Sequence, residues 1–246
     1  MENEISNEYI ENAVIELSGF FGIKEPIDGE KIFSLVKRGK VEDGIKLIAR
    51  QLGLPININI TDVPNDYRSQ GGQNQFHSNY LVKTNKDGKG SEGITAQVNI
   101  PSNLPFYGTL ALSGFPINVK ISSNCVVYPE AFCIIMAHEL SHILLYSLNH
   151  IKKENEFYTD LVAMLLGFQK IFRDGRKITE TLGTENDFFG TTTKTQTTTY
   201  GYLSDTQFNF AINKINSLLK IDESIKEKLI DKKTILMNCY TYIKKN

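Results

Sequence analysis

The run IIMAHELSHILL (134–145) constrains the fold of this chain most, because it places ionisable side chains inside an apolar stretch. His138 and His142 are four residues apart, so on a helix their imidazoles project from one face. Glu139 lies between them in the sequence. Burying these three side chains together costs several kcal/mol unless each finds a partner. A metal ion held by both histidines would supply that partner.

The run also has the residue types of a hydrolytic zinc site. Zinc in such sites takes three protein ligands, commonly imidazoles and a carboxylate, and keeps a fourth position for water. Glu139 directly follows the first histidine, so its carboxylate is expected beside that water without binding the metal. The pattern therefore predicts His138 and His142 as metal ligands and Glu139 as the catalytic general base.

Two acids further along the chain are candidates for the third ligand. Glu156 comes fourteen residues after His142, and a break at 149–153 lets the next helix fold back beside the first. Asp160 is one helical turn after Glu156, on the same face. In one arrangement Glu156 binds the metal and Asp160 accepts the free ring N–H of a ligand histidine, but either acid could be the third ligand. Alternatively, both acids are solvated at a helix N-terminus, where the dipole favours them.

The segments HELSH (138–142) and NEFYTD (155–160) resemble the HExxH and NExxxD motifs of gluzincin zinc metallopeptidases, which include the thermolysin-like enzymes. The resemblance implies that the zinc ligands are His138, His142 and Glu156. It also implies that Glu139 is the base and that Asp160 hydrogen-bonds His138. It covers about 27 residues, and its two motifs are closer together than in thermolysin.

A peptidase also needs a group that stabilises the oxyanion, and no histidine follows His150. Tyr200 and Tyr202 are therefore the candidates for this catalytic role. Tyr158 is another, although its place between the two acids favours a side chain that faces away. Because the chain has 11 tyrosines, packing or surface roles are the alternative for each. The segment YGYLSDTQFNFAI (200–212) is similar to one in uncharacterised bacterial HExxH proteins, which implies no activity.

Apolar periodicity predicts helices at both ends of the chain and a sheet between them. Helices are expected over residues 5–18, 29–38, 40–52, 129–148, 154–173, 204–219 and 222–244. Strands are expected over residues 57–63, 79–84, 93–100, 108–114 and 117–123. The polar residues 176–203, with the threonine-rich 191–201, are expected to form a mobile loop. Ser204 is expected to cap the helix that follows, paired with Gln207 in a capping box.

This order favours an α+β, zincin-like fold, in which a small, mostly antiparallel sheet packs on the active-site helix pair. The length of 246 residues suits one domain over residues 1–246. Its expected parts are helices in 1–53, the sheet in 54–123, active-site helices in 124–175, and a polar loop with C-terminal helices in 176–246. By analogy with zincins, 108–114 or 117–123 is expected to be the sheet edge that holds an extended substrate.

Composition excludes several classes of protein. The formal net charge is −1 and the pI about 6.4, so neither nucleic acid nor a membrane is an expected partner. The acidic N-terminus lacks a signal-peptide pattern, and no apolar run is long enough for a transmembrane helix. The three cysteines have no zinc or redox spacing, and their odd number argues against a disulfide framework. We expect a cytoplasmic, bacterial protein.

The sequence therefore predicts a zinc metallopeptidase that hydrolyses peptide bonds in a peptide or protein substrate. The alternative is a catalytically inactive, zincin-like module that binds a metal ion or a partner. A helical domain without any metal is a third possibility.

Overall fold

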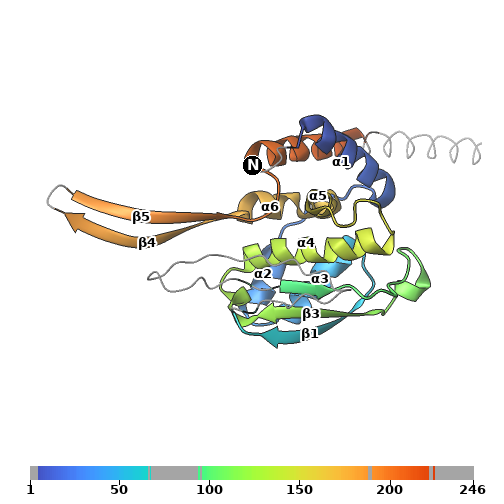
Figure 1. Ribbon diagram of the computed structural model, residues 1–246, viewed down its shortest axis with the longest axis horizontal. Helices are drawn as coiled ribbons and strands as arrows, with labels where there is room; N and C mark the ends of the chain where they lie inside the picture. The colour runs from blue at the N-terminus through green and yellow to red at the C-terminus, as the bar shows by residue number, and fades with distance from the viewer. Residues whose placement is uncertain are drawn as a thin grey trace, which may run out of the picture.

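Helix α4 (Pro129–Ser147) lies at the centre of the computed structural model, which describes residues 5–65, 67, 94, 96–187, 190–221 and 224. Seventeen of its 19 residues are buried, as expected for a helix that is apolar on all sides. It packs against α2 (Glu30–Lys37), α3 (Val41–Leu52), α5 (Glu156–Ala163), α6 (Gln169–Gly175) and strand β2 (Ala96–Asn99). Figure 1 shows α4 between the sheet on one side and α5 and α6 on the other.

The N-terminal helices and the helix after residue 204 confirm the sequence prediction. Helix α1 (Asn7–Phe21) begins at Ser6, whose hydroxyl accepts a hydrogen bond from the Tyr9 N–H, and it packs on α5. A last described helix covers residues 205–221. Its predicted capping box is present, because the Ser204 N–H donates to the Gln207 side chain and the Gln207 N–H to the Ser204 hydroxyl. The helix predicted over 222–244 lies outside the described residues, except for residue 224.

Within the described residues, the sheet has three strands in the order β1 (Asn57–Val63), β3 (Pro116–Ser122), β2. Seven residue pairs join β1 and β3 in parallel, and four join β2 and β3 antiparallel. The expectation of a mostly antiparallel sheet was therefore wrong. Parallel strands must be joined by a long crossover connection, and the chain between β1 and β3 is long enough to form one. The spacing of apolar residues does not reveal such a connection. The predicted strand 79–84 lies outside the described residues.

Neither of the two segments predicted as the substrate-binding edge forms an edge strand, so this prediction was wrong. Residues 108–114 contain only a short 3-10 helix, η1 (Leu110–Leu112), between two glycines, Gly108 and Gly114, with positive φ of 81° and 72°. These glycines turn the chain at both ends, so no strand forms. Residues 117–123 belong almost entirely to β3, which is the central strand, and a second 3-10 helix, η2 (Ser123–Val126), follows it. Among the described strands, β2 is the edge on the side of α4.

The predicted helix over 154–173 is interrupted. Helix α5 passes into a π-helical turn, η3 (Met164–Phe168), before α6 begins. Gly167 has φ of 103° there, which only glycine adopts without strain. The carbonyls that the interruption releases accept hydrogen bonds from the Lys24 N–H, the Ile27 N–H and the Gln51 side chain. These partners come from distant parts of the chain, so helical periodicity alone could not predict the break.

The polar residues 176–203 were predicted as a loop, and this was wrong as well. In the described part of this segment, β4 (Lys177–Asp187) and β5 (Gly190–Thr199) pair as an antiparallel hairpin, with an irregularity between Thr181 and Gly183. Threonine is β-branched and favours extended backbone, which outweighs the low complexity of the segment. Figure 1 shows the hairpin extending away from the helices.

The described structure is therefore α+β, as predicted. Among the described helices, none is long and apolar enough to cross a membrane. Of the three cysteines, Cys125 and Cys133 are described, and both are buried and unpaired. That residues 1–246 form a single domain stays a prediction.

The interruption after α5 gives a stability prediction. A Cβ at Gly167 would lie 2.6 Å from the Glu25 carbonyl oxygen, in addition to the strain of its positive φ. We expect Gly167→Ala to lower the free energy of unfolding by about 2–4 kcal/mol in urea titrations. The control is Gly19→Ala in α1, where a Cβ meets nothing within 4 Å, and which should be neutral or stabilising. Equal stability of the two variants would contradict this account of the interruption.

Candidate metal centre

Helix α4 carries the two histidines and the glutamate of HELSH into the interior. His138 is 0%, Glu139 2% and His142 3% exposed. The two imidazole rings are 4.9 Å apart between centroids, as expected for residues one helical turn apart. The prediction that both histidines face one site is therefore confirmed.

Glu156 reaches the same point from α5. Asn155 caps this helix by accepting hydrogen bonds from the backbone N–H groups of Phe157 and Tyr158, so Glu156 is its first residue. The Glu156 Oε2 atom lies 2.8 Å from His138 Nε2 and 3.3 Å from His142 Nε2. Ligand atoms of these three residues all lie within 4.8 Å of one another, so together they could bind a metal ion.

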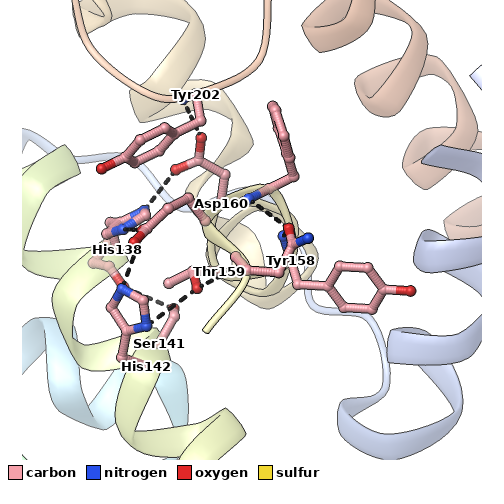
Figure 2. A network of polar contacts seen from close by, with 11 residues as sticks. His138, Ser141, His142, Tyr158, Thr159, Asp160 and Tyr202 are labelled. Atoms are coloured by element: carbon pink, nitrogen blue, oxygen red, sulfur yellow. Dashed lines mark hydrogen bonds and ion pairs between the residues drawn. The ribbon is translucent and has the colours of Figure 1, made fainter. Parts of the chain in front are cut away.

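Asp160 lies on the other side of the His138 ring. It is 1% exposed, and its Oδ1 atom is 2.7 Å from His138 Nδ1 (Figure 2). Its Oδ2 atom accepts a hydrogen bond of 2.6 Å from the Tyr202 backbone N–H. A carboxylate that accepts the Nδ1–H leaves Nε2 to face the metal, which is the supporting arrangement predicted for Asp160. The structure thus brings Glu156, and not Asp160, to the Nε2 atoms of both histidines.

A threonine that the sequence analysis missed supports His142. Thr159 is fully buried, and its Oγ1 atom lies 3.3 Å from His142 Nδ1. The same hydroxyl donates to the Asn155 carbonyl at 3.2 Å, so its oxygen is free to accept the Nδ1–H of His142. This tautomer leaves His142 Nε2 as the ligand atom. No motif marks Thr159, and only its place one turn after the helix cap could have suggested the contact.

Glu139 stands next to the three possible ligands but is not one of them. Its carboxylate accepts a hydrogen bond from the backbone N–H of Val98 in β2. Its Oε1 atom is buried and has no hydrogen-bond partner among the described residues. Burial raises the pKa of Glu139 to about 8, with the Glu156 carboxylate adding to the shift. A buried carboxylate oxygen without a partner is costly, and a water at the site would pair with it.

The pKa values of the ionisable groups at the site show which positive charge a bound cation would replace. Burial lowers the pKa of His138, but hydrogen bonds to Asp160 and Glu156 outweigh it and raise this pKa to about 10. Burial raises the pKa of Glu156, but the two imidazoles lower it to about 2. His142 has a lowered pKa because of burial. A protonated His138 thus offsets part of the negative charge of the carboxylates around it, and a divalent ion between the three ligands would take over this role.

Of the three tyrosines considered for the oxyanion, Tyr202 lies at the site. Its ring is stacked on His138, with centroids 5.4 Å apart and 30° between the planes, and it is 42% exposed. Tyr158 faces away, as Figure 2 shows, and its hydroxyl donates to Glu16 at 2.9 Å. Tyr200 is buried, and its backbone N–H donates to the Arg176 carbonyl. The catalytic role of Tyr200 stays a prediction.

The chain has no match among models of known protein families, among curated proteins or among solved structures. The resemblance to gluzincins therefore rests on the two sequence motifs and stays an expectation. The geometry of the site joins two imidazoles and one carboxylate that could bind a metal ion.

Metal binding can be tested by thermal unfolding with and without zinc as the probe. Zinc at 100 times its Kd should stabilise the wild-type protein by about 2.7 kcal/mol. His142→Ala removes one ligand and should abolish this shift. The control is His150→Ala, which removes another buried histidine, 3.2 Å from Glu16, outside the three ligands. This variant should unfold at a lower temperature than wild type but keep the zinc-dependent shift. Equal shifts in both variants would contradict the assignment of His142 as a metal ligand.

Proposed function

We propose that this protein is a zinc-dependent metallopeptidase of the gluzincin type. One observation carries the proposal: Oε1 of the buried Glu139 has no hydrogen-bond partner among the described residues and lies beside three convergent side chains that could hold a metal ion. Those three are His138, His142 and Glu156. Metal ligands alone would fit a structural site, but structural zinc sites are closed by four protein ligands. The three candidate ligands found in the described part of the chain, with a base nearby, fit a hydrolase better.

The residue types support zinc as the metal. Two imidazoles and one carboxylate form the ligand set of many catalytic zinc sites. The partners on the far side of each imidazole, Asp160 for His138 and Thr159 for His142, orient both rings with Nε2 towards Glu156. Zinc bound there would polarise a substrate carbonyl and make water a nucleophile at neutral pH.

Glu139 is the general base in this proposal. It accepts a proton from the attacking water and passes it to the leaving amine. Burial raises its pKa to about 8, and the positive charge of a zinc ion at the site would lower this pKa and favour the carboxylate form that accepts a proton. The hydrogen bond from Val98 holds one side of the carboxylate and leaves Oε1 for the transferred proton.

Strand β2 and Tyr202 are the groups that this proposal assigns to the peptide substrate. Because the Val98 N–H bonds to Glu139, β2 runs directly beside the base. We assign β2 as the edge that pairs with an extended peptide, in place of the segments expected from the sequence. Tyr202 is half exposed above His138, so its hydroxyl is the candidate donor to the oxyanion.

An inactive metal-binding module is the second candidate. The burial of the site favours it, because both histidines and Glu139 are at most 3% exposed. The side chain of Glu156, at 33%, gives the ligand set its contact with solvent. A substrate carbonyl must therefore reach the site past Glu156 and Tyr202.

Cleavage of a proteome-derived peptide library separates the two candidates. A peptidase should cleave library peptides, and Glu139→Gln should lower the rate by about 100- to 10,000-fold while zinc content stays at one per chain. Glu130→Gln is the matched control, because it makes the same change in the first turn of α4, where Glu130 pairs with Lys37. Cleavage that persists in Glu139→Gln would reject the base. Zinc binding without any cleavage by the wild-type protein would support the inactive module.

A further inference from the structure

Residues 200–203 form a turn that passes directly over Asp160. The turn follows β5 and precedes the helix over 205–221. Its Tyr202 N–H donates to Asp160 Oδ2 at 2.6 Å, while Asp160 Oδ1 lies 2.7 Å from His138 Nδ1. The two oxygens of one buried carboxylate thus connect the 200–203 turn to a candidate metal ligand (Figure 2).

Gly201 allows this close approach. Its φ is +91°, and a Cβ built on it would lie 3.2 Å from Asp160 Oδ2. Any other residue would be strained in its backbone and would press on the carboxylate. The glycine is thus needed by the contact with Asp160 as well as by the turn.

Arg176 holds both ends of the turn. Its carbonyl accepts the Tyr200 N–H at 2.6 Å, and its guanidinium Nη2 donates to the Leu203 carbonyl. The guanidinium is itself fixed, because it is buried, lies 4.4 Å over the Phe208 ring and is 3.6 Å from Asp205. The side chain and the backbone carbonyl of Arg176 therefore fix the distance between the turn and Asp160.

We propose that the 200–203 turn positions the metal centre, with Gly201 and Arg176 as its positioning residues. This inference rests on the metal centre of the proposed function. The turn holds Asp160 through Oδ2, so that Oδ1 orients the Nδ1–H of His138. This orientation of the ring sets the metal affinity. Arg176 directly precedes β4 and Tyr200 directly follows β5. The residues at the base of the β4–β5 hairpin are therefore the ones that hold the turn over Asp160.

The test compares two glycines of similar conformation. Gly201→Ala adds backbone strain and a methyl group against Asp160. Gly108→Ala adds similar strain, at φ +81°, but its Cβ meets nothing within 4 Å. Zinc affinity is measured by competition with a chromophoric chelator. We expect Gly201→Ala to bind zinc about tenfold more weakly than wild type, as for loss of a group that orients a ligand, and Gly108→Ala to match wild type.

A second measurement separates positioning from general loss of stability. The Nδ1–H proton of His138 should give a downfield NMR resonance in the zinc-loaded protein. This resonance should move in Gly201→Ala and remain in place in Gly108→Ala. If Gly201→Ala does not fold, Arg176→Lys carries the test, because lysine keeps the charge but cannot make the same paired contacts.

The outcomes are distinct. Normal zinc affinity and an unmoved resonance in Gly201→Ala, with wild-type protein that binds zinc, would overturn the positioning role alone. Wild-type protein that takes up no zinc would overturn the metal centre and the positioning role together. Weaker zinc binding in Gly201→Ala or Arg176→Lys, together with a moved His138 resonance, supports the inference.

Discussion

Helix α4 is buried on nearly all sides, so the polar groups it carries must find their partners inside the protein. His138 is paired through both ring nitrogens, with Asp160 and Glu156. His142 lies within contact of Thr159 and Glu156. All three partners lie on α5, which its cap starts at Glu156, and the turn after β5 holds Asp160 through the Tyr202 N–H.

Much of the site could be predicted, because local rules place its residues. Helical spacing puts His138 and His142 on one face, and the break at 149–153 places Glu156 near the start of the next helix. The pairing of Asp160 with His138 was also predicted and is present. Each of these inferences needs only residues within one helix or across one short connection.

The rest could not be predicted, because it depends on backbone groups brought together from distant segments. The Val98 N–H at Glu139 and the Tyr202 N–H at Asp160 leave no residue-specific signal, since any non-proline residue supplies an N–H. The parallel pairing of β1 and β3 depends on a long crossover. The break at Gly167 depends on Lys24, Ile27 and Gln51, which lie far away in sequence. The threonine-rich hairpin was missed because its composition is polar and repetitive, although its backbone preference is extended.

The central claim is that two imidazoles and one carboxylate from adjacent helices bind one metal ion. Anomalous diffraction at the zinc absorption edge, from crystals of protein grown with zinc, tests it most directly. The account predicts one peak about 2.0–2.2 Å from Nε2 of His138, Nε2 of His142 and a carboxylate oxygen of Glu156. A crystal with no peak there, or a peak bound by Asp160 in place of Glu156, would contradict it.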